Sequence, residues 1–233
     1  MEGIACGKRI ILVCLLMFGL AGFVIGQESG TAYSDRVLVE EFWCELDPFV
    51  READVYPLSK EEISRRLLEE AQFVFSGMIY GFSFSYTPLD RARGVKEEFS
   101  LVPHAEIPWG DPDLVVLDSG VQGDRFCARI RYAVKLFQER WISGWESATL
   151  PIVSGIGIGK VSGGYTEKLS SYRDAIKEAI RGDQRLTTPN KPREIRGDVV
   201  LVSAPYCIVD AGTYTSRLQV KIRISEIVPY RIY

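Results

Sequence analysis

Histidine and paired cysteines, from which many catalytic and metal sites are built, are scarce in this chain of 233 residues. His104 is the single histidine, which excludes sites that need several imidazole ligands. The five cysteines include no Cys-x-x-Cys pair, so the usual redox and zinc motifs are missing. Basic residues are not in excess either, because the net charge is −3. We therefore predict no metal, no cofactor and no nucleic-acid partner.

Long apolar runs are also rare, and the clearest one stands at the N-terminus. Lys8 and Arg9 precede an uncharged apolar stretch over residues 10–24, and polarity returns at Gln27. A membrane-spanning helix needs about 20 apolar residues, whereas a shorter stretch after basic residues is typical of a signal peptide. We predict a cleavable signal peptide over residues 1–26 and a periplasmic or secreted mature protein that starts at Gln27. An uncleaved N-terminal anchor is the alternative.

Three cysteines remain after this cleavage: Cys44, Cys127 and Cys207. An odd number in an oxidising compartment is compatible with one disulfide and a free thiol, or with three buried thiols. No cysteine directly follows the apolar stretch, so lipidation of the new N-terminus is not predicted.

Two segments of the first half have a clear periodicity. Ser59 is a good N-cap, Glu62 completes a capping box, and apolar residues follow at helical spacing through Phe75. Aromatic residues then alternate with small ones, which predicts a strand with one aromatic face. That face consists of Tyr80, Phe82, Phe84 and Tyr86. We expect it to pack under the preceding helix; if uncovered, it becomes a surface for a partner.

The second half begins with a glycine-rich strand over residues 151–160. Gly155, Gly157 and Gly159 fit neither the phosphate-binding loop nor the dinucleotide fingerprint, because the spacing differs from both. Such alternation is more typical of close backbone packing. A helix follows, and we expect it to end at Gly182. A strand over residues 198–203 is then predicted, which Pro205 breaks and residues 207–209 resume, and residues 214–227 are predicted as the last long strand.

An internal repeat connects the two halves. At an offset of 92 residues, Asp118-Ser119-Gly120 matches Asp210-Ala211-Gly212, and a long amphipathic strand follows each turn. The first of these strands is expected over residues 125–137. We predict an α+β fold of two related helix-on-antiparallel-sheet modules, residues 27–144 and 145–233, the first with an inserted aromatic hairpin and Pro-rich loop. Chance convergence of two amphipathic hairpins is the alternative.

A glycine-rich strand, a helix with the sequence Ala-Ile-Lys-Glu-Ala-Ile-Arg and a C-terminal hairpin occur together between Pro151 and Ile227. This combination resembles small helix-on-sheet modules of exported bacterial envelope lipoproteins and flagellar-assembly proteins. The resemblance implies an envelope location and a non-enzymatic role, and it transfers no catalytic residue.

Few residues are placed to perform catalysis. His104 lies in a Pro-flanked loop, and no Gly-x-Ser-x-Gly motif frames a nucleophile, so we interpret it as a solvated loop histidine. Asp111 and Asp113 flank Pro112, which favours a turn over a calcium or glycan site. The Arg-Gly-Asp triplets at 181–183 and 196–198 are interpreted as a helix end and a turn. We therefore predict no catalytic residue and no enzymatic activity.

Cations of both predicted hairpins form the main candidate surface. They alternate with apolar residues, so each set should lie on the outward face of its strand. The sets are Arg125, Arg129 and Arg131, and Arg217, Lys221 and Arg223. With the aromatic strand, they are the candidate surface for a protein partner in the envelope, with contact to the wall or membrane surface as alternatives.

We expect a structural or binding protein of an envelope assembly. One alternative is a periplasmic hydrolase that acts on glycan through Asp111, Asp113 or Glu106. A second alternative is an outer-membrane β-barrel, because strands are numerous.

Overall fold

The computed structural model describes residues 31–46, 57–146, 149–187 and 190–230. Within these ranges the chain is an α+β protein with helices packed on antiparallel sheets, so the predicted fold class is confirmed. The predicted signal peptide lies outside the described residues. No helix in the described ranges combines the length and apolar character that a membrane crossing requires.

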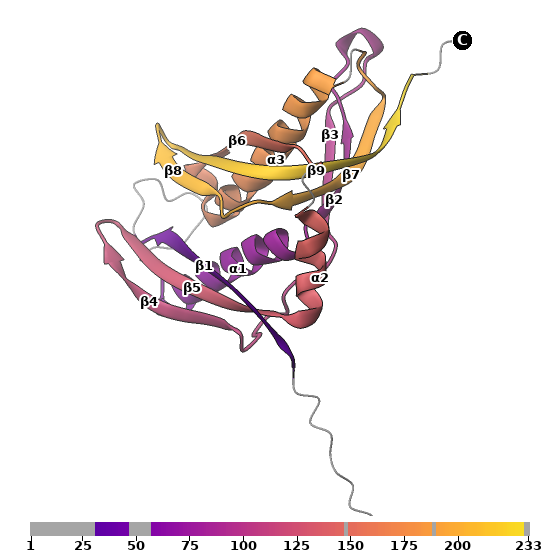
Figure 1. Cartoon of the computed structure of the whole chain (residues 1–233). Coiled ribbons are helices and arrows are strands. Elements are labelled where there is room, and N and C mark those ends of the chain that lie inside the picture. Colours follow the sequence, from indigo (N-terminus) through magenta and orange to yellow (C-terminus); the bar gives the residue numbers. More distant parts are fainter. Residues whose placement is uncertain (1–30, 47–56, 147–148, 188–189, 231–233) are drawn as a thin grey trace, which may run out of the picture. The chain divides into compact units, whose positions relative to one another are not determined.

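The first sheet is antiparallel and has the strand order β1-β5-β4. It contains β1 (Tyr33–Glu45), β4 (Leu114–Gln122) and β5 (Arg125–Lys135). Helix α1 (Lys60–Ile79) lies along β1 and β5 (Figure 1). The Ser59 hydroxyl accepts the backbone N–H of Glu62 at 3.1 Å, which confirms the predicted N-cap. Alternate residues of β5, from Ala128 to Val134, are buried against this helix in one apolar core.

The second sheet has the order β3-β2-β7-β9-β6, with β8 also paired to β9. Its strands are β2 (Phe82–Thr87), β3 (Glu98–Pro103), β6 (Ile152–Lys160), β7 (Glu194–Leu201), β8 (Tyr206–Asp210) and β9 (Thr213–Val228). Helix α3 (Tyr165–Thr187) packs on β6 and β9. It continues past Gly182, so the predicted helix end there was wrong and the first Arg-Gly-Asp triplet lies inside the helix.

The three glycines of β6 face α3 and let the helix approach the strand backbone. A Cβ atom at Gly155, Gly157 or Gly159 would lie 1.9, 2.0 or 2.1 Å from a carbonyl oxygen of α3. No side chain fits in that space, because real Cβ contacts are never so short. The glycine alternation is therefore explained by helix–strand packing, as the sequence indicated.

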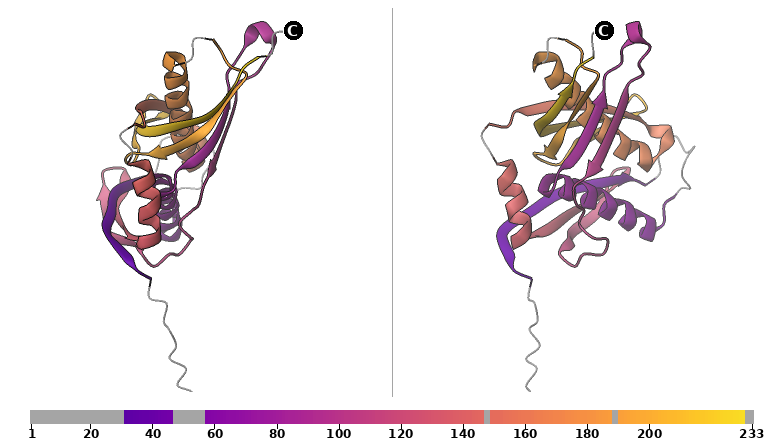
Figure 2. Two further views of the ribbon diagram at one scale, coloured as in Figure 1. Left: turned by 45° about the vertical axis from the view of Figure 1, so that its right-hand side comes forward. Right: turned by 90° about the vertical axis from the view of Figure 1, so that its right-hand side faces the viewer.

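The aromatic strand is covered, as we expected, but the preceding helix α1 covers only part of it, with the Phe73 ring 5.4 Å from that of Phe82. Phe82, Phe84 and Tyr86 of β2 share a core with α3, β7 and β9, and with Tyr80 they are 5 % exposed or less. β2 pairs with β7, and the hairpin β2–β3 runs beside the strands of the second half (Figure 2). Gly197 of β7 lies opposite Phe84 and leaves room for its ring. These four aromatic residues therefore cannot form a partner surface.

A repeated topology is present in the two halves. In each half, a strand and a helix are followed by further strands, and the last strand lies in the middle of a three-strand layer. The first half follows the order β1-α1-β4-β5, and the second follows β6-α3-β7/β8-β9. Hairpin β2–β3 is inserted in the first half. The described residues from Ala32 onward nevertheless cluster as one compact unit. The 92-residue offset does not superpose the turns, because Gly120 lies within β4 whereas Gly212 lies in a turn with φ 78°. The repeat is therefore one of topology, and the residue matches reflect a shared amphipathic pattern.

Cys44, Cys127 and Cys207 are all buried free thiols. Burial raises the pKa of Cys44 to about 11 and also raises the pKa of Cys127 and Cys207. All three thiols are therefore poor nucleophiles at neutral pH.

Candidate functional site: a tryptophan pocket beside helix α2

Helix α2 (Leu136–Trp145) begins where the sequence predicted that a strand would continue to Phe137. Gln138, Ile142 and Trp145 recur at helical spacing and are buried. The amide of Gln138 donates to the hydroxyl groups of Tyr80 and Tyr132 at 2.8 and 2.9 Å, and its oxygen accepts the backbone N–H of Lys135. This buried polar residue fixes the start of α2, and its spacing with Ile142 and Trp145 is the signal that sequence reasoning missed.

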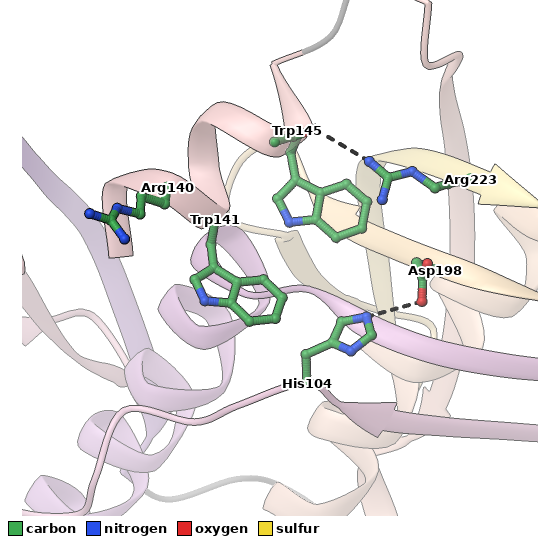
Figure 3. Close-up of a pocket in the computed structure, with 7 residues that line it drawn as sticks. His104, Arg140, Trp141, Trp145, Asp198 and Arg223 are labelled. Carbon is green, nitrogen blue, oxygen red and sulfur yellow. Dashed lines mark hydrogen bonds and ion pairs between the residues drawn. The ribbon is translucent and has the colours of Figure 1, made fainter. Parts of the chain in front are cut away.

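A pocket of about 310 Å³ opens beside this helix (Figure 3). Its wall combines α2 with the loop after β3 and with the interior strands β7 and β9, so both halves of the chain contribute. The side chains that line it are His104, Arg140, Trp141, Trp145, Asp198 and Arg223. Of the predicted surface residues, only Arg223 belongs to this set.

The two indole rings of the pocket are held differently. Trp141 is 40 % exposed, and its ring lies between Tyr80, edge-on at 5.7 Å, and the His104 ring at 5.8 Å. Trp145 is 6 % exposed, and the Arg223 guanidinium lies over its ring at 4.8 Å. Trp141 therefore presents a fixed aromatic surface to solvent, while Trp145 anchors the back of the pocket.

His104 is paired rather than simply solvated. Its Nε2 lies 3.1 Å from Asp198 Oδ1, and its backbone N–H donates to the carbonyl of Gly81. Asp198 is opposite Arg223 in the register of β7 and β9. The second Arg-Gly-Asp triplet thus lies within β7, and its aspartate faces the pocket. Nothing local to either residue indicates this pairing, which depends on long-range strand register.

Two of the predicted surface cations bind the end of α2. Lys221 Nζ donates to the carbonyl oxygen of Trp145 at 2.7 Å, and the Arg223 guanidinium donates to that of Gly144 at 3.3 Å. The last carbonyl groups of a helix lack intrahelical partners and carry partial negative charge, so both contacts are favourable. The predicted outward alternation along β9 is confirmed, but Lys221 and Arg223 bind the end of α2 and so do not belong to one open cationic face with Arg217.

The remaining cations of the predicted surface lie on separate sheets. Arg125 stacks on Trp43 at 4.0 Å, whereas Arg129 is exposed on β5, in register between Glu41 and Asp118. Arg131 neighbours Val39 and Val115 on the same face. Arg217 is exposed on β9 between Ile156 and Tyr206. These four cations do not converge on one site, unlike the residues that line the pocket.

Two of the three acidic residues named for the hydrolase alternative, Asp111 and Asp113, are bound by a lysine. Lys135 Nζ lies 2.6 Å from Asp111 and 3.4 Å from Asp113, and the Tyr33 hydroxyl also donates to Asp113. Burial acts to raise the pKa of Asp111, but the hydrogen bond from Lys135 and the backbone N–H of Asp113 outweigh it, so the pKa is lowered. In the described ranges, no three or more histidine, cysteine or acidic side chains gather where a metal ion would fit.

A buried ionic cluster joins α1 to α3. Lys168 Nζ donates to Glu70 at 2.8 Å and to the carbonyl of Trp43 at 2.6 Å, and the Tyr172 hydroxyl donates to the same carboxylate. The side chains of Lys168 and Glu70 are only 2 % and 3 % exposed. The cluster is almost fully buried and links the two helices to each other and to β1.

The fold and the pocket together define an α+β protein with a small aromatic and basic surface site. A protein-family model matches residues 27–230, so the chain belongs to the family that this model describes. An uncharacterized protein of Treponema pallidum (strain Nichols) is 28 % identical over 167 residues, which cover 72 % of this chain and 70 % of that protein. No solved structure matches the chain.

Proposed function

We propose that this is an exported binding protein of the cell envelope, in which the tryptophan pocket receives part of a partner. The fixed, partly exposed ring of Trp141 carries this proposal. A side chain already held in its bound position loses little conformational entropy on binding, which favours affinity. The polar groups beside it, Asp198 and Arg223, supply orientation and specificity, as in most ligand sites.

Two observations support the export part of the proposal. The N-terminal pattern of Lys8, Arg9 and the apolar stretch is typical of a signal peptide. The family match begins at Gln27, the residue at which we expect the mature chain to start. The resemblance of residues 151–227 to modules of envelope proteins points in the same direction.

The lowered pKa of Asp111 and the ion pairs of Asp111, Asp113 and Asp198 favour binding over glycan hydrolysis. A glycosidase needs one carboxylic acid with a raised pKa as proton donor. Asp111 has a lowered pKa and is bound by Lys135 together with Asp113. Asp198 is paired with His104 beside aromatic rings, an arrangement suited to recognition.

Site-specific photo-crosslinking in the cells that produce the protein tests this proposal. A photoreactive residue at position 140, on the pocket rim, should give a discrete adduct in the envelope fraction, and Trp141→Ala should remove it. The matched control carries the photoreactive residue at position 109, because Trp109 is 58 % exposed and does not line the pocket. No adduct from position 140, or an adduct that Trp141→Ala leaves intact, would overturn the proposal.

A further inference from the structure

We propose that the tryptophan pocket binds an acidic saccharide, with the flat face of a sugar ring on Trp141 and the carboxylate of the sugar at Arg223. This inference rests on the proposed binding function, since it names the ligand of the same pocket. Three features of the pocket lead to it: the aromatic surface, the planar polar groups around it and the surplus of positive charge.

The aromatic surface suits a ligand with one apolar face and polar edges. Trp141 and Trp145 project from α2 to the same side, toward His104 and Asp198 (Figure 3). The Trp141 ring contacts Tyr80 and His104 and is still 40 % exposed, so part of its surface is available to a ligand. A pyranose presents C–H groups on its faces and hydroxyl groups around its rim, which matches a rigid indole bordered by polar side chains.

The polar groups beside the ring match the hydroxyl groups of a sugar. Asp198 gives one oxygen to His104, and a carboxylate has further lone pairs that accept O–H donors. The Arg223 guanidinium has five N–H groups, one of which donates to the carbonyl of Gly144. Both side chains are fixed by these contacts, so a ring on Trp141 meets an acceptor and a donor that are already oriented.

Charge selects an acidic ligand over a neutral one. Two guanidinium groups, those of Arg140 and Arg223, line the pocket against the single carboxylate of Asp198. Arg223 is the guanidinium nearer to Asp198, whereas the side chain of Arg140 extends away from His104 at the outer rim (Figure 3). A carboxylate on the ligand would form a charge-assisted pair with Arg223 and use the positive surplus.

An acidic peptide is the competing ligand, and the strand order argues against it. Extended peptides usually bind by adding a strand to an open sheet edge. The pocket lies over β7, an interior strand that is paired with both β2 and β9 and therefore offers no edge to an added strand, and beside Arg223 of β9, which is paired with Asp198 of β7. A compact ring ligand needs only side-chain contacts, and those are what the pocket wall provides.

Titration of the purified protein with N-acetylmuramic acid, the neutral N-acetylglucosamine and an acetylated Asp-Glu-Asp peptide tests the inference. Binding is followed through the indole N–H signals in NMR spectra. We expect saturable shifts of the Trp141 and Trp145 signals with the acidic sugar, and about tenfold weaker binding of the neutral sugar. Binding of the peptide but of neither sugar, or equal binding of both sugars, would overturn the inference.

Two variants test the contributions of the Trp141 ring and of the Arg223 charge separately. Trp141→Ala should abolish the binding of both sugars. Arg223→Met keeps an apolar stem over Trp145 and should remove the preference for the acidic sugar, so that both bind alike. The controls are Trp109→Ala and Arg217→Met, the latter on the same face of β9 but outside the pocket. If Arg223→Met retains the full preference, the carboxylate does not bind there and the inference is wrong.

The two experiments fail independently. An envelope adduct from position 140 without sugar binding would overturn the saccharide inference and leave the binding function supported. Sugar binding by the purified protein without an envelope adduct would support the saccharide inference and overturn the proposed envelope partner.

Discussion

The ammonium group of Lys221, on strand β9, donates to the carbonyl oxygen of Trp145, the last residue of helix α2, at 2.7 Å. This contact ties the helix that carries both pocket tryptophans to the sheet that carries Asp198 and Arg223. The strand pattern predicted that Lys221 lies on a free face, whereas this contact gives it a structural role.

Loss of this contact should destabilise the protein. Lys221→Met keeps the aliphatic stem but leaves the Trp145 carbonyl without its charged donor, so we expect the free energy of unfolding to fall by about 1–2 kcal/mol. Arg217→Met, also on the outward face of β9, is the control and should change it by less than about 0.5 kcal/mol. Chemical denaturation measures both, and equal effects would contradict the role assigned to Lys221.

Local patterns predicted local structure well. The Ser59 cap, the outward cations of β5 and β9 and the helix-facing glycines of β6 all follow from residues that are close in sequence. Each of these features depends on one turn of helix or on the two-residue period of a strand.

Long-range pairing could not be predicted in the same way. The aromatic residues of β2 are placed by Gly197 of β7, and His104 meets Asp198 only because β2 and β7 pair. Helix α2 was missed because its buried face includes the polar Gln138, whose partners Tyr80 and Tyr132 are known only from the fold. The helical spacing of Gln138, Ile142 and Trp145 is the one local signal for the pocket, and the rest of its wall depends on long-range strand pairing.

The predicted export can be checked directly on the native protein. Mass spectrometry of the protein from its envelope or secreted fraction should show an N-terminus at or close to Gln27, because the apolar stretch ends just before it. A mature pool that begins at Met1 would favour the uncleaved anchor instead.

Replacing only one residue of the buried ion pair between Glu70 and Lys168 should strongly lower the free energy of unfolding. Lys168→Met leaves a carboxylate that is 3 % exposed without its cation, so we expect a loss of about 3–5 kcal/mol in unfolding free energy. Adding Glu70→Gln removes the unpaired charge, and Gln can still accept from Tyr172.

The double variant should therefore be more stable than Lys168→Met alone. Thermal unfolding of the two variants decides this. If the double variant is the less stable one, the cost does not arise from an isolated buried charge.

Glu62 should make stability depend on pH in the acid range. Hydrogen bonds from Arg65 and Arg66, the first being the larger effect, lower its pKa from 4.5 to about 2 in the folded protein, although burial opposes this. The folded state therefore binds fewer protons at this group, so its contribution is present above pH 4.5 and is lost as the pH falls toward 2. Urea unfolding of Glu62→Gln should show a deficit at pH 7 that disappears near pH 2. A deficit independent of pH would exclude the carboxylate charge as its cause.

The packing of α3 on β6 predicts a large effect of one added methyl group, and the chain supplies its own control. A Cβ atom at position 157 would lie 2.0 Å from the carbonyl oxygen of Ser171 and 2.2 Å from the backbone nitrogen of Ala175. Neither backbone atom can move without displacing α3, so Gly157→Ala should cost about 3 kcal/mol or more. Gly182 lies inside α3 with nothing within 4 Å of its Cβ position, so Gly182→Ala should stabilise the helix by about 0.5–1 kcal/mol. Denaturant unfolding should therefore show changes in unfolding free energy of opposite sign for the two Gly→Ala substitutions. A mild effect at position 157 would show that α3 does not pack on the backbone of β6.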